Sequence, residues 1–256
     1  MTVVCFPMTQ NWNPSLYERN AGFVAEYGLG VVNLLKPRPG ERILDLGCGD
    51  GRLTEALVAA RSTVVGVDSS PQQVEAARKR GLDVRVMDAE SLDFTEEFDA
   101  VFSNAALHWA KQSQKVVEGV WRALRKGGRF VGEFGAHGNV KTICGAIADA
   151  LQDRGLDFAQ LNPWYFPTAQ EYRSHLEAVG FRINLIRAFE RRTPLPGDIL
   201  GWLETFAQSF VAPLPLSDRL EFFEEIRDTL RPHLQDNNGT WFADYIRLRF
   251  AATKPR

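Results

Sequence analysis

The sequence predicts a doubly wound α/β fold, in which helices cover both faces of a seven-stranded, mostly parallel sheet. From residue 41 onward, short runs of apolar and β-branched residues alternate with amphipathic stretches of helical period. Glycines and capping residues separate these segments. Two later segments alternate apolar and polar residues, which predicts two further strands. This alternation predicts parallel strands that are joined through helices. In folds of this kind the ligand binds at the carboxyl ends of the strands, and we expect a ligand there.

The composition is that of an ordinary globular protein. Of 256 residues, 45% are hydrophobic and 24% are charged, and the net charge of -2 argues against a nucleic-acid partner. The three cysteines lack metal-ligand spacing and fit a reduced cytoplasm. The sequence has no signal-peptide pattern and no apolar run of about 18 residues, so no membrane partner is expected. We expect one cytoplasmic domain, a monomer or weak dimer, that binds a small molecule and no metal.

The N-terminal segment, residues 1–37, is predicted to form a cap that begins with a helix. Asn13 followed by Pro14 is a helix-start signal. Trp12 and Tyr17 have two interpretations: they anchor the core, or they close over a ligand beside the glycine-rich turn described next. The inward face of the segment is predicted to contain three apolar side chains, Phe23, Tyr27 and Leu34.

The first strand and the turn that follows it are the strongest indication of a ligand-binding site in the sequence. Residues 43–46 are an apolar run interrupted by Asp45, and Gly47, Gly49 and Gly51 follow as a Gly-x-Gly-x-Gly turn before a helix. Glycines there permit a tight turn and a close approach of a ligand to backbone N–H groups. The helix start adds free N–H donors and the positive end of its dipole.

Strand-terminal acids continue this pattern along the predicted sheet. The second strand, residues 63–68, ends at Asp68, which can accept both hydroxyls of a ribose. Ser70 to Gln73 reads as a capping box that opens the next helix. The third strand, residues 84–87, is followed by Asp88 and Ala89.

The next two strands flank another predicted helix. Residues 98–103 form the fourth strand, followed by Asn104. A helical stripe from Val116 to Leu124 is expected to stop at Gly127-Gly128, and residues 130–134 form the fifth strand.

Beyond the fifth strand the pattern changes. Residues 139–153 read as a helix, and 162–167 as an aromatic loop. Thr168 to Glu171 is a second capping box, which opens a helix that ends at Gly180. The strands near 181–185 and 244–250 complete the sheet, the last of them antiparallel.

Between these strands, residues 194–239 contain two amphipathic helices, which we expect Asp198 and Ser217 to cap. We interpret them as a helical lid over the carboxyl edge, with extension of the core as the alternative. The predicted organisation is one domain with a cap at 1–37, a cofactor-binding core at 38–136, and a C-terminal part at 137–256 that carries the lid.

The positions of the glycines and acids indicate the kind of cofactor. A dinucleotide site would show Gly-x-Gly-x-x-Gly, whereas here the third glycine, Gly51, comes one position early. Asp45 would repel a pyrophosphate but attract an ammonium group, directly or through water. Asp68 suits a ribose, and Asp88 can accept the amino group of adenine. A cofactor with an amino-acid end and an adenosine end, such as S-adenosylmethionine, matches these acids.

At these motifs the sequence resembles the class I S-adenosylmethionine-dependent methyltransferases. The resemblance rests on Asp45–Gly51, Asp68, Asp88-Ala89 and Asn104, and covers roughly residues 38–136. It implies a Rossmann-like seven-stranded sheet, with the turn near the methionine part of S-adenosyl-L-methionine and S-adenosyl-L-homocysteine as the product. The cofactor-binding residues then expected are Asp45, Gly47, Cys48, Gly49, Asp68, Ser69, Asp88, Ala89, Asn104, Trp12 and Tyr17.

A narrower resemblance is to the trans-aconitate methyltransferase group. It rests on the segments 12–17, 68–71 and 104–109, and less specifically on 164–166 and 193–196. It implies that Trp12 and Tyr17 border the cofactor site. It does not identify the acceptor, because the lid segments carry no pattern that can be transferred.

The chemistry of methyl transfer leaves the catalytic role of His108 open. In-line displacement requires alignment and exclusion of water, and a carboxylate acceptor needs cationic or hydrogen-bonding anchors in place of a base. A hydroxyl or amine acceptor would profit from a base, and His108 after the fourth strand is the candidate base or a lining residue. Trp109 and Glu133 are further candidates to contact the substrate, and a structural role of Glu133 is the alternative.

Two other functions compete with this interpretation. A nicotinamide-dependent oxidoreductase would use a similar fold, although the early third glycine and Asp45 argue against it. A regulatory module that binds the cofactor without turnover would keep the same cofactor residues.

Overall fold

The computed structural model describes residue 10 and residues 12–256, which divide into two compact units. Unit 1 contains the described residues up to Ala21, with Gly138–Pro163 and Glu190–Tyr245. Unit 2 contains Gly22–His137, Trp164–Phe189 and Ile246–Arg256. The N-terminal segment is thus shared between the units, with its first helix in unit 1 and its second in unit 2.

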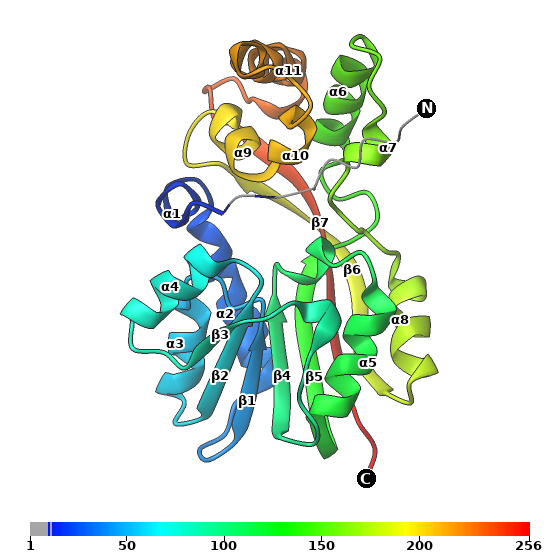
Figure 1. Ribbon diagram of the computed structural model, residues 1–256. Coiled ribbons are helices and arrows are strands. Elements are labelled where there is room, and N and C mark those ends of the chain that lie inside the picture. The colour runs from blue at the N-terminus through cyan, green and yellow to red at the C-terminus, as the bar shows by residue number, and fades with distance from the viewer. Residues whose placement is uncertain (1–9, 11) are drawn as a thin grey trace. The chain divides into compact units, whose positions relative to one another are not determined.

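A seven-stranded sheet organises unit 2 (Figure 1), with strand order β3-β2-β1-β4-β5-β7-β6. The pairs β1–β2, β1–β4, β2–β3 and β4–β5 are parallel, whereas β5 and β7 are antiparallel. The predicted fold class, a mostly parallel seven-stranded sheet with an antiparallel last strand, is confirmed. The strands are β1 (Arg42–Leu46), β2 (Thr63–Asp68), β3 (Val84–Val86), β4 (Phe98–Asn104), β5 (Leu124–Gly135), β6 (Arg182–Pro194) and β7 (Phe242–Thr253).

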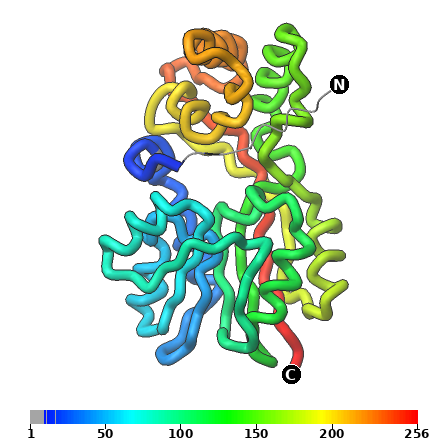
Figure 2. The backbone as a smooth tube through the Cα atoms, viewed as in Figure 1, coloured from blue at the N-terminus to red at the C-terminus, as the bar shows by residue number. Residues whose placement is uncertain are grey.

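Helices cover both faces of this sheet. On one face, Val31 and Leu35 of α2 and Leu57 of α3 are buried against Ile43 and Phe102. On the other face, α5 and α8 pack against β5 and β7, and Figure 2 shows these two helices (green to yellow-green) across the strands from α3 and α4 (cyan). The helices of unit 2 are α2 (Phe23–Leu35), α3 (Arg52–Ala59), α4 (Pro71–Lys79), α5 (Ser113–Ala123) and α8 (Ala169–Ala178), with short 3₁₀ turns η1 (Ala89–Ser91) and η2 (Leu107–Trp109).

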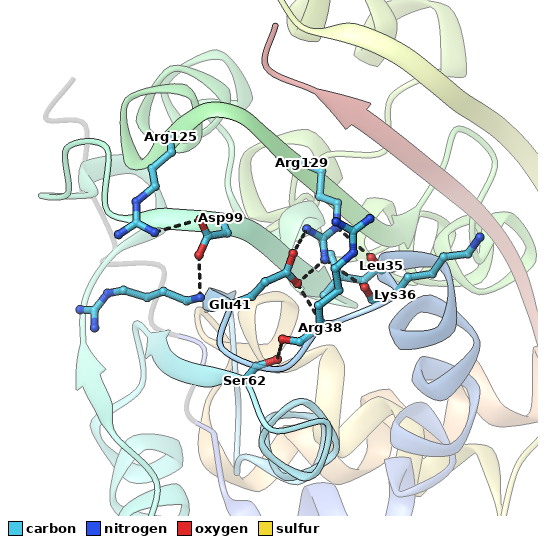
Figure 3. Close-up of polar contacts among 9 residues, drawn as sticks. Leu35, Lys36, Arg38, Glu41, Ser62, Asp99, Arg125 and Arg129 are labelled. Carbon is cyan, nitrogen blue, oxygen red and sulfur yellow. Dashed lines mark hydrogen bonds and ion pairs between the residues drawn. The ribbon is translucent and has the colours of Figure 1, made fainter. Parts of the chain in front are cut away.

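Polar contacts tie together the edge of the sheet where the parallel strands begin (Figure 3). Arg129 of β5 donates to both oxygens of Glu41, each over 2.7 Å, and to the carbonyl of Leu35 over 2.8 Å. Burial opposes the charge of Glu41, but the hydrogen bonds from Arg129 and from the Arg38 amide outweigh it and hold the pKa of Glu41 below its ordinary value. Bidentate pairing of this kind is among the stronger surface interactions.

The helices of unit 1 pack on one another. Asn20 donates to the carbonyl of Gly201 over 2.9 Å, which joins α1 to α9. Trp202 donates to the hydroxyl of Tyr245 over 2.7 Å inside the core. The helices of the unit are α1 (Pro14–Ala21), α6 (Lys141–Gln152), α7 (Phe158–Leu161), α9 (Ile199–Phe206), α10 (Gln208–Val211) and α11 (Arg219–Leu234), with the 3₁₀ turn η3 (Leu216–Asp218). Across the described part of the chain, no helix is long and apolar enough to cross a membrane.

Most predicted helix starts are confirmed. The Asn13 side chain accepts from the amides of Ser15 and Leu16, and Asp198 accepts from the amide of Leu200. Thr168 and Glu171 form both hydrogen bonds of a capping box.

Two predicted caps need correction. Ser70 accepts from the Gln73 amide as expected, but its own amide donates to Asp68, so the reciprocal bond of a capping box is replaced. Ser217 does not cap α11, because its hydroxyl donates to Asp218 and the helix starts one residue later through a 3₁₀ turn.

One predicted helix boundary and one predicted buried face also need correction. α5 ends at Ala123 and β5 begins at Leu124, because Leu124 already pairs with Phe98, so Gly127 falls within the strand rather than ending the helix. Tyr27 is 40% exposed, since the buried face of α2 is formed by Gly28, Val31, Val32 and Leu35.

Candidate functional site

The glycine-rich turn after β1 has the geometry that its sequence predicts. Gly47, Gly49 and Gly51 all have positive φ, at 77°, 55° and 87°. The amides of Gly47 and Cys48 donate to the carbonyl of Val67 over 2.8 and 3.0 Å, which ties the turn to the end of β2. A Cβ on Gly49 would meet no heavy atom within 4 Å. The outer side of the turn is therefore open to a ligand at Gly49.

Asp45 lies beneath this turn and is almost completely buried, at 2% exposure. Its Oδ2 accepts a hydrogen bond of 2.6 Å from the hydroxyl of Thr54 on α3. Burial raises the pKa of Asp45 to about 7; the Thr54 hydrogen bond opposes this rise and the charge of Asp68 adds to it. The carboxyl group is thus held by one donor in a site where a cation would stabilise its charged form.

Asp68, at the end of β2, faces the same turn. Its Oδ2 accepts from the Gly49 amide and its Oδ1 from the Ser70 amide, each over 2.9 Å. Burial raises the pKa of Asp68, while these two amide hydrogen bonds lower it. Each carboxylate oxygen retains a lone pair, so Asp68 can still accept ligand hydroxyls.

Four further predicted cofactor residues follow these strands or lie in the turn. Asp88 is exposed at the start of η1 and accepts from the Glu90 amide, and the Met87 amide before it bonds the carbonyl of Asp68. Ala89 begins η1 and Ser69 is exposed beside Asp68. Cys48 is buried, and burial raises the pKa of its thiol.

The segment after β4 closes the other side of the turn. Ala105 takes a left-handed conformation, with φ of 56°, and its amide donates to the carbonyl of Glu133 over 2.7 Å. This bend brings Ala106 so close to Gly47 that an added Cβ would lie 2.1 Å from the Ala106 Cβ. Asn104 donates to the Val24 carbonyl over 3.5 Å, which places it beside α2.

His108 lies in the 3₁₀ turn η2, which follows β4. The Gly135 amide of β5 donates to its Nδ1 over 3.4 Å, and the side chain is 8% exposed. Burial lowers the pKa of His108 to about 3, and the positive charge of Arg247 lowers it further. The imidazole is therefore neutral at pH 7.

Aromatic rings gather around His108. Its ring lies 5.5 Å from that of Trp109 and 5.7 Å from that of Phe166, measured between centroids. Trp164 lies 6.0 Å from Trp109 and 5.8 Å from Phe166. The Tyr165 amide donates to the His108 carbonyl, so the predicted aromatic loop is attached to η2.

Glu133 is engaged within the sheet. Its Oε2 accepts from the Arg249 Nε of β7 over 2.6 Å, and its side chain is 3% exposed. This favours the structural alternative for Glu133 over direct contact with an acceptor.

The remaining predicted site residues lie in unit 1. The Trp12 ring packs edge-on against Phe206 of α9, with centroids 6.3 Å apart. Tyr17 belongs to α1, but its side chain is outside the described part of the structure. That Trp12 and Tyr17 border the cofactor, and that residues 194–239 act as a lid, stay predictions.

Three residues at this edge escaped sequence reasoning: Thr54, Ala106 and Arg247. Thr54 is a polar residue at a buried position of an amphipathic helix, which is a detectable signal. Ala106 and Arg247 carry no comparable signal, because their roles depend on contacts between distant segments.

Comparisons with known proteins agree with this geometry. Residues 44–132 match a family model described as a methyltransferase domain. The chain is 40% identical to an uncharacterized methyltransferase of Schizosaccharomyces pombe, over 95% of this chain and 98% of that protein. It is 31% identical to a trans-aconitate 2-methyltransferase of Mycobacterium marinum, over 94% of this chain and 95% of that protein.

Two solved structures share the fold. An S-adenosylmethionine-dependent methyltransferase from Mesorhizobium loti has a TM-score of 0.54 at 21% identity, over 90% of this chain and 97% of that one. A phosphoethanolamine N-methyltransferase 2 of Haemonchus contortus, solved with S-adenosyl-L-methionine, has a TM-score of 0.58 at 21% identity, over 90% of this chain and 53% of that one.

Proposed function

This chain belongs to the class I S-adenosylmethionine-dependent methyltransferases, and we propose that it methylates a carboxylate of a small molecule. The family decides between the three functions that the sequence raised, in favour of the methyltransferase. The carboxylate acceptor is our proposal. It is supported by the state of His108 and by the relatives that are named trans-aconitate 2-methyltransferases.

The residues at the carboxyl edge fit S-adenosylmethionine. The buried acid Asp45 would balance its ammonium group, directly or through water, since an ionised carboxylate in a buried site needs a cation. The turn leaves the outer side of Gly49 open for close approach. Asp68 would accept from the ribose hydroxyls, and Asp88 with Ala89 would lie at the adenine.

When bound, S-adenosylmethionine supplies a methyl group on a sulfonium, whose neutral thioether leaves without needing a proton. The protein has to orient the acceptor oxygen in line with the methyl carbon and exclude water. His108, Trp109 and Phe166 offer an apolar, aromatic wall at the edge where this alignment is required. Trp12 and Tyr17 are proposed as further borders of the cofactor.

His108 is the observation that favours a carboxylate over a hydroxyl or amine acceptor. A general base works best when its pKa lies near the operating pH, whereas the pKa of His108 is about 3 and its Nδ1 accepts from Gly135. A carboxylate is already ionised near neutral pH and needs no base. We therefore assign His108 to lining of the site.

The test is transfer of a labelled methyl group from S-adenosylmethionine to a panel of acids that includes trans-aconitate, with phenols and amines beside them. We expect base-labile label, as in a methyl ester, on an acid. Label confined to phenols or amines would refute the carboxylate acceptor. Calorimetry with S-adenosylhomocysteine on the same sample checks that the cofactor site is intact.

A further inference from the structure

The turn that follows Asp88 is short and lies outside the core. η1 spans Ala89–Ser91, and none of its residues is buried. The Ser91 amide donates to the Asp88 carbonyl over 3.0 Å, and the Glu90 amide donates to Asp88 Oδ1 over 2.9 Å. Hydrogen bonds in a 3₁₀ turn have poorer geometry than those of an α-helix. The direction of the Asp88 carboxylate therefore depends on what else holds this turn.

The side chain of Glu90 joins the turn to the start of α5. Its Oε1 accepts from the backbone amide of Gln112 over 2.9 Å, and its Oε2 accepts from Nε2 of the same residue over 2.8 Å. Both carboxylate oxygens are thus held, which fixes the direction of the side chain as well as its distance. Gln112 immediately precedes α5, in the stretch that joins η2 to this helix.

α5 is a well-packed support for this contact. Its buried side chains include Val116, Val117 and Val120, which lie in the core of unit 2. Directly after η1, Leu92 is buried against the same helix, because a Cβ added to Gly119 would lie 3.2 Å from the Leu92 Cβ. η1 is therefore attached to α5 twice, through the side chain of Glu90 and through the packing of Leu92.

We infer that Glu90 is a positioning residue: held by Gln112, it fixes η1 so that the Asp88 carboxylate is aimed at the amino group of adenine. The inference rests on the proposed cofactor site, in which Asp88 lies at the adenine. The bond from the Glu90 amide to Asp88 Oδ1 passes a displacement of Glu90 on to the carboxylate. Hydrogen bonds weaken steeply when their angle is lost, so recognition of the amino group depends on this contact.

The experiment compares the affinities for S-adenosylhomocysteine and S-inosylhomocysteine, whose base carries an oxygen in place of the amino group. Gln112→Glu replaces the side-chain donor by a second carboxylate, which repels that of Glu90. Adding Glu90→Gln restores both bonds, since the introduced amide donates to the new carboxylate and its oxygen accepts from the backbone amide. Gln114→Glu is the matched control, because Gln114 donates to Glu118 over 3.2 Å in a bond that stays within α5.

Calorimetry gives the preference as the ratio of the two dissociation constants. We expect wild type to bind S-adenosylhomocysteine at least about tenfold more tightly than S-inosylhomocysteine. Gln112→Glu should reduce this preference about 3- to 10-fold, the double variant should restore most of it, and Gln114→Glu should keep it. A general loss of stability would weaken both ligands alike and leave their ratio unchanged, so the ratio isolates the positioning role.

An unchanged preference in folded Gln112→Glu, or no recovery in the double variant, would overturn the role of Glu90. Asp88→Ala separates this failure from that of the cofactor site, because it should abolish the preference. If Asp88→Ala keeps the preference, or if wild type has none, both the placement of adenine at Asp88 and this inference are wrong. These measurements need no acceptor, so they are independent of the proposed carboxylate.

Discussion

The hydroxyl of Thr54 donates to Oδ2 of the buried Asp45 over 2.6 Å, which joins the helix after the glycine-rich turn to the strand before it. The two residues lie in the elements that flank the turn, Asp45 in β1 and Thr54 in α3. The hydrogen bond supplies one donor to a carboxyl group whose pKa burial has raised to about 7. Asp45 is therefore costly to ionise until a cation arrives.

Replacing Asp45 by Asn should stabilise the cofactor-free protein at high pH. The folded-state pKa of about 7 lies above the ordinary value, so the stability associated with the protonated group is present at low pH and is lost as the pH rises towards 7. Between pH 5.5 and 8 we expect wild type to lose about 2 kcal/mol relative to Asp45→Asn. Urea unfolding at both pH values measures this.

The same substitution should weaken cofactor binding at pH 8, because the carboxylate that balances the ammonium is gone. A stability difference that is constant with pH would contradict the raised pKa, and an unchanged cofactor affinity would contradict the ammonium role.

Asp68→Ala should raise the dissociation constant of S-adenosylhomocysteine about 10- to 100-fold, since hydrogen bonds to a charged acceptor are lost. Asp83→Ala is the matched control, because it removes the same charge from a side chain that is 61% exposed. Asp68 also holds the Gly49 and Ser70 amides, so thermal melting must accompany the titration. Equal affinities of the two variants would remove Asp68 from the site.

Gly47→Ala should destabilise the protein by about 3 kcal/mol or more, because the strain of positive φ is combined with a steric clash. Its Cβ would lie 2.1 Å from the Cβ of Ala106. Gly40→Ala isolates the strain, since Gly40 has φ of 81° and open space around it, and should cost about 1 to 2 kcal/mol. Adding Ala106→Gly should recover the steric part alone; if it recovers nothing in denaturant unfolding, the contact is not the cause.

His108→Asn tests whether a base is used. Asn can accept from the Gly135 amide as Nδ1 does, so the fold should persist. We expect the rate with an acid acceptor to stay within about tenfold, and the pH–rate profile between pH 6 and 8 to keep its shape, because base catalysis would contribute about 10²- to 10⁴-fold. A loss of that size with an altered profile would restore His108 as a base.

Glu41→Gln should destabilise the protein without affecting the cofactor. It breaks the bidentate pair with Arg129 at the edge of the sheet where the parallel strands begin, and we expect a loss of about 1 to 3 kcal/mol at pH 7. The pKa of Glu41 is lowered, so this stability is present above the ordinary value of a glutamate and is lost as the pH falls through the folded-state value. The difference in the free energy of unfolding between wild type and Glu41→Gln should therefore shrink in acid. Calorimetry should show that the variant keeps the wild-type affinity for S-adenosylhomocysteine.

The sequence by itself determined the succession of strands and helices along the chain, and which acidic and glycine residues stand at the ends of the strands. Period-two and helical patterns are local, and so are the preferences of glycine for positive φ and of Thr168 or Asp198 for helix starts. Asp45, the glycine turn and Asp68 could therefore be named together, because parallel strands end at one edge.

Only the tertiary structure decided which distant side chains meet at that edge. The contacts of Thr54 with Asp45, of Ala106 with Gly47, and the proximity of Arg247 to His108 depend on strand register, on the bend at Ala105 and on helix packing. The same holds for the pKa values, since burial dominates those of Asp45 and His108 and no local pattern reports burial at a single position. The ion pair of Glu133 with Arg249 joins residues that are 116 apart in the sequence. They meet because β5 and β7 are neighbours in the sheet and their register places the two residues opposite each other.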